Sequence, residues 1–264
     1  MTTLIFLKLG GSLITDKTGV EAVRPGVLTR LCDEIAAVRR DQPDLQLLLG
    51  HGSGSFGHVA AAKHGTRNGV SSLSEWAGFA EVSSAAARLN RLVVEALQAA
   101  GVPALTLQPS ASAVCANGRI TQIATAPMQS ALAAGLLPVV YGDVAFDTMR
   151  GGTIISTEEV MTVVANELTP TWLLLAGETA GVLDQDGRVI PEITRETLPR
   201  FASALGGSRG TDVTGGMVSK VNNMLQLVEK HPQLQIRIFS GLAAGLLQAV
   251  MQNPQLAVGT LLYR

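Results

Sequence analysis

The sequence has few cysteines, few aromatic residues and almost no net charge, and each shortage excludes a class of protein. Its only cysteines, Cys32 and Cys115, are far apart and lack metal-ligand spacing, so we expect reduced structural thiols. The formal net charge of -1 gives no electrostatic attraction to nucleic acid or to an anionic membrane. Aromatic residues make up only 4% of the chain, which argues against a surface that stacks bases.

Targeting and membrane-spanning patterns are also missing. Residues 1–11 show no basic region followed by a signal-like apolar run. The most apolar stretch, Ala131–Tyr141, contains Gly135 and Pro138 and is too short to span a bilayer. We therefore expect a cytoplasmic protein that binds neither a membrane nor nucleic acid.

Several familiar site motifs are absent or incomplete. The chain has no G-x-x-x-x-G-K-[ST] loop, no H-E-x-x-H and no Cys/His cluster, so we expect neither a P-loop kinase nor a protein metal site. Gly52–Gly57 does match G-x-G-x-x-G after a strand, but the next strand of a dinucleotide-binding unit is missing. The acidic residue at the right distance, Glu75, lies at the start of a predicted helix, so we rank dinucleotide binding low.

Hydrophobic residues make up 47% of the 264 residues, enough to bury a large core, and they form alternating strand and helix patterns. The predicted strands are Leu4–Leu9, Leu45–Leu49, Ala104–Leu107, Leu137–Tyr141, Trp172–Ala176, Ile236–Phe239 and Val258–Leu262. The predicted helices are Pro25–Arg40, Ser74–Ala100, Thr125–Gly135, Ser156–Leu168, Thr214–Lys230 and Leu242–Met251. This order predicts an α/β fold with a mostly parallel central sheet covered by helices on both faces.

Glycine turns and lysines mark the candidate site. Turns are predicted at Gly10-Gly11-Ser12, Gly50–Gly57, Gly142-Asp143 and Thr214-Gly215-Gly216, the region where open α/β sheets bind ligands. Two of them open helices, whose free N–H groups favour anions. Lys8 precedes the first turn, Lys17 follows it, and Lys220 follows the last. Each feature alone has an ordinary structural explanation, but their order together predicts a polyphosphate site.

These motifs resemble those of the amino-acid-kinase superfamily and, within it, of the isopentenyl phosphate kinases, over nearly the whole chain. His51–His58 is similar to the family element His-Gly-Gly-Gly-x-Phe-Gly-His, which is shared mainly with fosfomycin kinases. The other matching segments are Lys8–Ser12, Thr15-Asp16-Lys17, Gln108-Pro109-Ser110, Gly142-Asp143 and Asp212–Met217 with Lys220. The resemblance implies an amino-acid-kinase-like α/β/α sandwich.

The sequence departs from the family pattern in three places. Ser53 replaces the middle glycine of the histidine element. Thr157 replaces the glycine of Ser-Gly-Asp-Asp, which reads Ser156–Glu159 here. The family's Thr-Asp-Val-Asp-Gly-Val reads Gly177–Val182, so we assign no role to residues 177–180 and take Asp184 as the nucleotide contact in that region.

The resemblance implies an enzyme that transfers the γ-phosphoryl group of ATP to isopentenyl phosphate and forms isopentenyl diphosphate. It implies one domain over residues 1–264, with an acceptor lobe at 1–170 and a nucleotide lobe at 171–264. It also implies a homodimer. We expect Mg²⁺ to arrive with the nucleotide, without a carboxylate site of its own.

Roles for individual residues follow from the same resemblance. Lys8 and Lys220 would hold the nucleotide phosphates, and Lys17 would stabilise the transferring group. Asp143 would orient Lys8 and Lys17, or would instead only order the loop that follows its strand. His58 would bind the acceptor phosphate. Backbone donors and further contacts would come from Gly10, Gly11, Ser12, Gly54, Gly215 and Gly216 for the nucleotide, and from Ser53 and Thr157 for the acceptor.

An isoprenoid acceptor needs an apolar wall beside His58. Phe79, Val82 and Ala86 share one face of the long helix that follows the histidine element, so we take them as that wall. Periodicity alone favours an ordinary core stripe, and the position of the helix after the histidine element is what supports the wall. Two other functions stay open, namely a kinase for fosfomycin or another small phosphate or phosphonate, and a non-catalytic nucleotide-binding regulator or storage protein.

Overall fold

The computed structural model describes residues 3–205 and 216–264, and its centre is an eight-stranded sheet with the order β10-β12-β11-β9-β1-β2-β6-β3. Neighbouring strands are parallel except for β11 and β12. This confirms the predicted α/β fold with a mostly parallel sheet. The strands are β1 (Leu4–Leu9), β2 (Gln46–His51), β3 (Ala104–Thr106), β6 (Leu137–Tyr141), β9 (Trp172–Gly177), β10 (Glu192–Ile193), β11 (Gln235–Ser240) and β12 (Thr260–Leu262).

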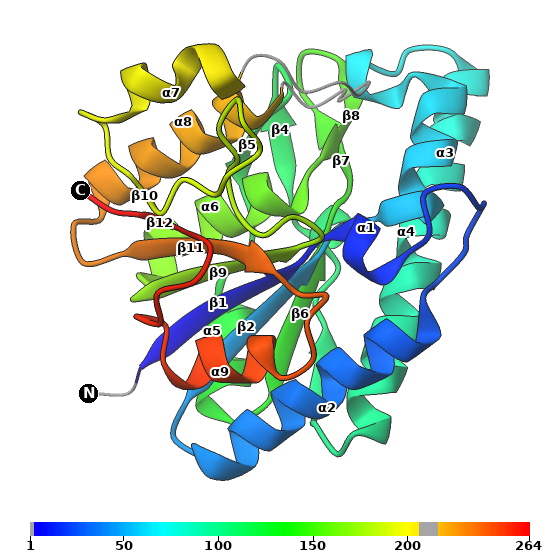
Figure 1. Cartoon of the computed structure of the whole chain (residues 1–264). Helices are drawn as coiled ribbons and strands as arrows, with labels where there is room; N and C mark the ends of the chain where they lie inside the picture. The colour runs from blue at the N-terminus through cyan, green and yellow to red at the C-terminus, as the bar shows by residue number, and fades with distance from the viewer. Residues whose placement is uncertain (1–2, 206–215) are drawn as a thin grey trace.

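Side chains alternate across this sheet and divide the core into two layers. Ile5, Leu7 and Leu9 of β1 face one layer, whereas Phe6 faces the other. One layer packs against α2 (Pro25–Asp41), α4 (Leu73–Ala99) and α9 (Leu246–Gln252). The other packs against α5 (Ala126–Ala133), α6 (Thr157–Leu168), α7 (Leu198–Leu205) and α8 (Gly216–Lys230). Figure 1 shows α2 and α9 on one side of the sheet and α6 and α8 on the other.

A smaller sheet, β5-β4-β7-β8, lies beside the carboxyl ends of the central strands. It contains β4 (Val114–Ala116), β5 (Arg119–Gln122), β7 (Asp143–Asp147) and β8 (Gly151–Ile155). Asn117-Gly118 forms the turn of the β4–β5 hairpin, as an Asn-Gly pair between two short runs predicts, and both turn residues have positive φ, 53° and 78°. Buried Asp147 accepts hydrogen bonds from both turn amides, at 3.1 and 2.6 Å, so the hairpin is fixed to the rest of the small sheet.

The glycine-rich segment 50–57 differs from the predicted turn. β2 continues to His51, and the helix α3 (Gly54–His64) begins within the segment. The Thr15 hydroxyl accepts from the Ser55 amide at 3.0 Å, which satisfies a first-turn N–H that a short surface turn would leave to water. Thr15 directly follows the short helix α1 (Gly11–Ile14) and is far from residue 55 in the sequence. The sequence around residue 54 therefore gave no local signal for this contact.

Two helices begin with capping boxes. Ser156 caps α6 together with Glu159, as its sequence predicts. Ser72 caps α4 together with Glu75, whose pKa is lowered to about 2 mainly by hydrogen bonds from the Ser72 and Ser71 amides. The carboxylate of Glu75 is therefore committed to the helix start, which removes it as a ribose ligand.

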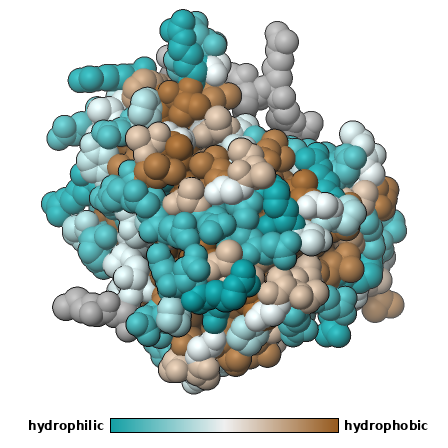
Figure 2. Space-filling view, turned by 60° about the horizontal axis from the view of Figure 1, so that its bottom comes forward, coloured by the Kyte–Doolittle hydropathy of each residue, from teal (hydrophilic) through white to brown (hydrophobic). Residues whose placement is uncertain are grey.

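The described helices include none that is long and apolar enough to cross a membrane. Figure 2 shows hydrophilic and hydrophobic residues mixed in small groups over one face of the molecule.

The central sheet runs without a break across residue 170, because β9 pairs with β1. Both halves of the sequence therefore contribute to one carboxyl edge, where the predicted site lies.

Candidate functional site

Five neighbouring parallel strands end at the same edge of the central sheet. Leu9 pairs with His51 and with Ala176, which brings the ends of β1, β2 and β9 level. His51 in turn pairs with Tyr141 at the end of β6, and Ala176 pairs with Phe239 of β11. The glycines at or just beyond these strand ends are Gly10, Gly52, Gly142, Gly177 and Gly241.

The first two glycine loops touch each other, and their contact leaves no room for side chains. A Cβ at Gly11 would lie 2.5 Å from the Gly54 nitrogen, and a Cβ at Gly52 would lie 2.7 Å from the Gly11 nitrogen. Gly54 also has φ +50°, and a Cβ there would overlap the Thr15 hydroxyl. The two loops therefore form one continuous backbone surface.

This backbone surface presents unpaired amides. Within the described ranges, the N–H groups of Gly11, Ser12, Ser53 and Gly54 donate to no protein acceptor. The N–H of Gly10 donates to the Ala176 carbonyl at 2.8 Å, so the prediction that Gly10 supplies a phosphate donor is wrong. Four amides on two touching loops can bind an anion in the manner of a phosphate loop.

Lys8 reaches this edge from β1 and forms an ion pair with Glu158 of α6, Nζ to Oε1 2.9 Å. Lys8 is mostly buried, with 13% of its side chain exposed, while Glu158 is 32% exposed. The charge of Lys220, on the first turns of α8, also acts on Glu158. Glu158 is therefore paired with Lys8, and its pKa is also lowered by the charge of Lys220.

Asp143 does not orient the lysines, contrary to the prediction. Its Oδ1 accepts from the Ser83 hydroxyl at 3.1 Å and from the Val144 amide at 2.8 Å, and its Oδ2 accepts from the Ser110 amide at 3.2 Å. Asp143 is buried, so these contacts fix β7 to α4 and to the 3-10 turn Pro109–Ala111. Ion pairs in the described residues give Lys8 and Lys17 other partners.

Glu158 is held in its charged form. Burial by itself raises the pKa of the carboxyl group, but the charge and hydrogen bond of Lys8, a backbone hydrogen bond and the charge of Lys220 lower it below the ordinary 4.5. A lowered pKa contributes stability that is present above about pH 4.5 and is lost as the pH falls through the folded-state value.

We expect Glu158→Gln to destabilise the protein at pH 7, because it leaves the buried Lys8 ammonium unpaired. Removing one partner of a partly exposed pair should cost about 2 kcal/mol, or about 5 °C in Tm. The difference from wild type should shrink as the pH falls from about 4.5, where Glu158 of the unfolded chain takes up a proton, through the lower pKa of Glu158 in the folded protein. Thermal unfolding followed from pH 3 to pH 8 measures both effects.

Glu229→Gln provides a matched control for this variant. Glu229 pairs with Arg195 at the surface, with 42% of each side chain exposed, so its loss should change Tm by less than about 2 °C. A Tm for Glu158→Gln equal to that of the control at pH 7 would contradict a structural role for the Lys8–Glu158 pair.

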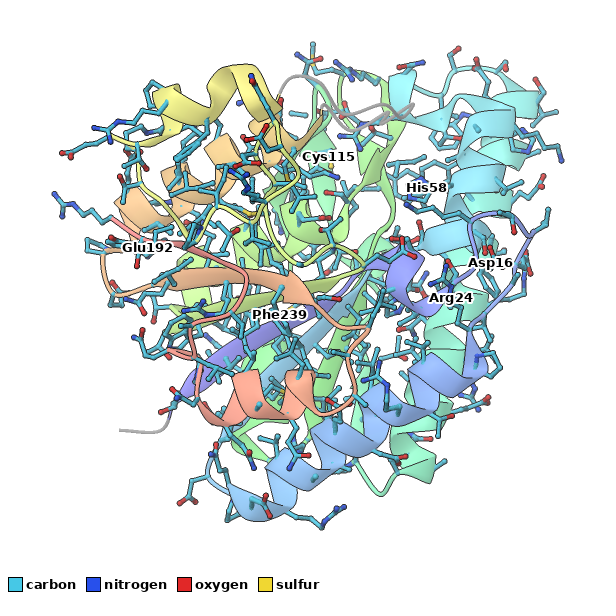
Figure 3. All side chains as sticks on the ribbon, viewed as in Figure 1. Asp16, Arg24, His58, Cys115, Glu192 and Phe239 are labelled. Carbon is cyan, nitrogen blue, oxygen red and sulfur yellow. The ribbon has the colours of Figure 1, made fainter. Side chains whose placement is uncertain are left out.

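Lys17 lies on the loop that follows α1 and is 71% exposed. Its ammonium lies 3.5 Å from Glu178 Oε2, and Arg24 lies 3.0 Å from Glu178 Oε1. Asp16 shapes this loop by accepting from the Thr18 amide and hydroxyl, at 2.9 and 2.8 Å. Figure 3 shows Asp16 and Arg24 together beside α1. Glu178 directly follows β9, so Lys17 and Arg24 stand over the same strand edge as Lys8.

His58 lies one turn into α3 and is exposed, with a partner inside the protein. Figure 3 shows it on the side of α3 that faces the body of the molecule. Ser53 occupies the N-cap position of the same helix without a side-chain capping hydrogen bond, and its side chain lies over Gly57, where a Cβ would come within 2.5 Å of the Ser53 hydroxyl oxygen. His58 and the Ser53 amide are thus carried by one helix start.

The remaining predicted contacts have mixed positions. Thr157 is buried and donates its hydroxyl to the His51 carbonyl at 2.6 Å, so its side chain faces the protein and leaves no hydroxyl for a ligand. Asp184 Oδ1 accepts from the Asp186 and Arg188 amides at 2.9 and 2.8 Å, which closes a tight turn and opposes its use as a nucleotide ligand. Gly216 begins α8, whereas Gly215 lies outside the described residues.

Phe79 and Val82 belong to a small hydrophobic cluster with Ala60 of α3 and Val144 of β7. The Phe79 ring lies 5.2 Å from Trp76 and 5.4 Å from Phe146 between ring centroids. Ala86 is buried as well but belongs to no part of this cluster. The cluster is separate from the main core and packs directly against the helix that carries His58.

Sequence reasoning missed Glu158, Glu178 and Arg24. One signal was available for Glu158, because it stands at the first aspartate of the Ser-Gly-Asp-Asp pattern and keeps its charge. Glu178 offered the same kind of signal, because it stands at the first aspartate of the Thr-Asp-Val-Asp-Gly-Val pattern and keeps its charge. For Arg24 the sequence offered no local signal, since 154 positions separate it from residue 178. Their pairing depends on β9 lying next to β1 in the sheet.

Carboxylates near the lysines do not form a metal site of their own. Among the residues that the structure describes, no group of three or more His, Cys, Asp or Glu side chains is placed to hold a metal ion. Glu158 and Glu178 are both paired with cations.

A model of the amino acid kinase family matches residues 3–240 of the chain. An isopentenyl phosphate kinase of Haloferax volcanii is 39% identical over 226 residues, which cover 85% of this chain and 88% of that protein. The chain belongs to the isopentenyl phosphate kinases of the amino acid kinase family. A relative of the same name in Methanocaldococcus jannaschii is 32% identical over 225 residues, covering 83% of this chain and 85% of its own.

The fold agrees with this membership of the isopentenyl phosphate kinases. A crystal structure of an isopentenyl phosphate kinase superimposes with a TM-score of 0.82 at 29% identity, covering 98% of this chain and 99% of that one. The match includes the carboxyl edge of the sheet, because it extends over almost the whole chain. The sequence resemblance described above is therefore confirmed at the level of family and fold.

Proposed function

We propose that this protein transfers the γ-phosphoryl group of ATP to isopentenyl phosphate and releases ADP and isopentenyl diphosphate. The observation that carries the proposal is the joined surface of the two glycine loops, which presents four unpaired amides beside Lys8, its partner Glu158 and Lys220. A polyphosphate needs both backbone donors and cations. Membership of the isopentenyl phosphate kinases supports the acceptor.

The reaction needs charge neutralisation more than it needs a base. A phosphate monoester has a second pKa of about 6, so an acceptor oxygen is already anionic near neutral pH. That oxygen attacks the γ-phosphorus, an O–P bond forms, and the bond from the γ-phosphorus to the β–γ bridging oxygen breaks. The electron pair stays on ADP, so no proton has to be removed from the acceptor. The main obstacle is repulsion between two anions.

Each cation has a distinct place in this scheme. Lys8 and Lys220 hold the nucleotide phosphates, with Glu158 keeping their ammonium groups in register. Lys17 moves from Glu178 to the transferring group, and Arg24 stays with Glu178. His58 and the Ser53 amide hold the acceptor phosphate, while Gly11, Ser12 and Gly54 donate backbone N–H groups. Mg²⁺ is bound to the nucleotide phosphates and offsets part of their charge.

Residues 1–170 carry the acceptor contacts, and residues 171–264 complete the nucleotide side. We include in the proposal a homodimer that works in the cytoplasm. Sedimentation equilibrium of the purified chain tests the dimer: a single species of twice the 27.5 kDa chain mass supports it, and a monomer at micromolar concentration opposes it.

An acceptor panel tests the proposed activity directly. ADP formation would be followed with ATP and Mg²⁺ in the presence of isopentenyl phosphate, fosfomycin or no acceptor. We expect turnover with isopentenyl phosphate and little with the other two. Turnover with fosfomycin but not with isopentenyl phosphate would show that fosfomycin is the acceptor. If no phosphate of a wide set supports ADP formation, a non-catalytic nucleotide-binding protein would be favoured.

The cluster of Phe79 and Val82 provides a test of the hydrocarbon pocket. If these side chains close the pocket beside α3, then Phe79→Ala or Val82→Ala opens space for a longer tail. One or two further buried methylene groups at about 0.8 kcal/mol each should raise the kcat/KM ratio of geranyl phosphate to isopentenyl phosphate about 10-fold. Steady-state kinetics with both acceptors measure that ratio.

Val93→Ala is the matched control for the pocket variants. Val93 is fully buried on the same helix, α4, but it packs in the main core. Its truncation should lower stability without changing the ratio between acceptors. An unchanged ratio in folded Phe79→Ala and Val82→Ala proteins would show that the cluster is ordinary core and that the tail binds elsewhere.

A further inference from the structure

His51, the last residue of β2, is completely buried and has no role in the mechanism above. Its Nδ1 lies 3.1 Å from the carbonyl oxygen of Gly52, and its Nε2 lies 3.1 Å from the side-chain amide oxygen of Asn90. Asn90 is itself buried on α4, and its amide nitrogen donates to the Thr106 hydroxyl at the end of β3 at 2.7 Å. A chain of buried polar groups thus runs from α4 and β3 to the second glycine loop.

We infer that His51 is a positioning residue that fixes the Gly52–Ser53 peptide, so that the Ser53 N–H points at the acceptor phosphate. This inference rests on the proposed function, because it assigns the Ser53 amide to the acceptor. A trans peptide group is planar and directs its C=O and N–H to opposite sides. A hydrogen bond that draws the Gly52 carbonyl toward the buried imidazole therefore turns the Ser53 N–H away from it, toward the outer surface of the loop.

The surroundings of the ring hold it in place for this task. The Tyr141 ring stacks on His51, with centroids 5.6 Å apart and planes 11° apart. The backbone of His51 is held as well, because its carbonyl accepts from the Thr157 hydroxyl at 2.6 Å. Thr157 therefore has a structural role, which explains why its side chain is buried instead of facing a ligand.

The buried surroundings favour the neutral form of the ring. Burial, the largest cause, lowers the pKa of His51, and the positive charge of Lys8 lowers it further, against hydrogen bonds at Gly52 and Asn90 that raise it. A neutral imidazole has one N–H. If that proton is on Nδ1 it is donated to the Gly52 carbonyl, and Nε2 must then accept from Asn90. The structure has the Asn90 oxygen toward Nε2 and the Asn90 nitrogen toward Thr106, so this tautomer requires the amide to turn by 180°. Its nitrogen then donates to Nε2 and its oxygen accepts from the Thr106 hydroxyl, so all three groups are satisfied.

The Ser53 amide is well placed to use this orientation. It donates to no acceptor within the described ranges, and it precedes α3 beside the equally unpaired Gly54 amide. Ser53 replaces a glycine of the family pattern, so its backbone has fewer accessible conformations. Its N–H is the group that we assign to the anion. Holding such a donor in advance avoids the cost of ordering it during the reaction.

The tautomer of His51 can be measured without any assay of activity. The chain has four histidines, so imidazole ¹⁵N spectra of the labelled protein can be assigned with single-histidine variants. We expect a neutral ring protonated on Nδ1 that does not titrate between pH 5 and pH 8. A ring protonated on Nε2, or one that gains a second proton in this range, would overturn the inference.

Two substitutions separate positioning from packing. In His51→Asn the amide nitrogen takes the place of Nδ1 and can still donate to the Gly52 carbonyl, whereas in His51→Gln it takes the place of Nε2. We expect kcat/KM for isopentenyl phosphate to fall at least about 10-fold in His51→Gln and to stay within about 3-fold of wild type in His51→Asn. The Kd for ATP should stay within about 2-fold in both.

The outcomes distinguish the inference from the proposed function. Equal losses in the two variants, or a loss of ATP affinity that parallels the loss of acceptor use, would show that His51 acts only through packing. If wild type does not use isopentenyl phosphate at all, the proposed function fails, while the ¹⁵N measurement still decides the tautomer. Thermal unfolding of each variant confirms that the compared proteins are folded.

Discussion

His58→Ala is expected to lower kcat/KM for isopentenyl phosphate about 100-fold and to leave the Kd for ATP within about 2-fold of wild type. His58 ends the Ser-Phe-Gly-His element and lies on the inner side of α3, whereas the nucleotide cations come from β1, α8 and the loop after α1. A lost hydrogen bond to an acceptor phosphate that tightens in the transition state is worth about 3 kcal/mol. Steady-state kinetics and ATP titration measure the two quantities separately.

His64→Ala is the control for this variant. His64 lies in the last turn of α3 and contacts Glu81 of α4 at 2.7 Å, so its loss disturbs the same helix without removing a phosphate ligand. We expect kcat/KM within about 3-fold of wild type. Wild-type kinetics in His58→Ala would remove His58 from the site, and equal losses in both variants would indicate that α3 is merely destabilised.

Lys17→Ala is expected to lower kcat about 1000-fold and to change the KM for ATP much less. Lys17 is the most exposed of the three site lysines that the sequence predicts, and its ion pair with Glu178 is long, at 3.5 Å. A weakly held ammonium can leave Glu178 and follow the negative charge that develops during transfer. An interaction gained only in the transition state is lost in kcat and not in KM.

Lys63→Ala is the matched control for Lys17→Ala. Lys63 is 61% exposed and also pairs with a glutamate, Glu81, but it lies at the far end of α3 from the glycine loops. Its loss should leave kcat within about 2-fold of wild type. A raised KM for ATP with unchanged kcat in Lys17→Ala would show that Lys17 is an anchor for the nucleotide and that another group acts on the transferring phosphoryl.

The carboxylates of the site explain how so many cations can stand together before any ligand binds. Lys8 pairs with Glu158, on which the charge of Lys220 also acts, while Lys17 and Arg24 share Glu178. Unpaired cations this close would repel one another and destabilise the fold. The two pairs differ in exposure, because Lys8 is mostly buried and Lys17 is mostly in solvent. We therefore expect Lys8 to stay fixed while Lys17 moves.

Much of the fold could be predicted because its signals are local. The apolar run of β1 and the run Leu137–Tyr141 have the bounds that the sequence predicts, since a buried parallel strand needs a short unbroken hydrophobic segment. Asn117-Gly118 and Ser156 likewise act through their own backbone conformations and hydrogen bonds. The start of α3 was missed because its first-turn amide is satisfied by Thr15, which is 40 positions away.

The sequence by itself determined the family, the α/β architecture and the set of glycine turns and lysines that make the site. Only the tertiary structure decided how those residues are used. Lys8 pairs with Glu158, and Asp143 fixes β7 instead of orienting the lysines. The Gly10 amide donates to the neighbouring strand β9, and the His51 ring contacts the Gly52 carbonyl. The physical reason is that an ion pair or a buried hydrogen bond depends on which side-chain ends meet across neighbouring strands. The strand order, which the packing of the whole core sets, determines which strand ends are neighbours and therefore which side chains can pair.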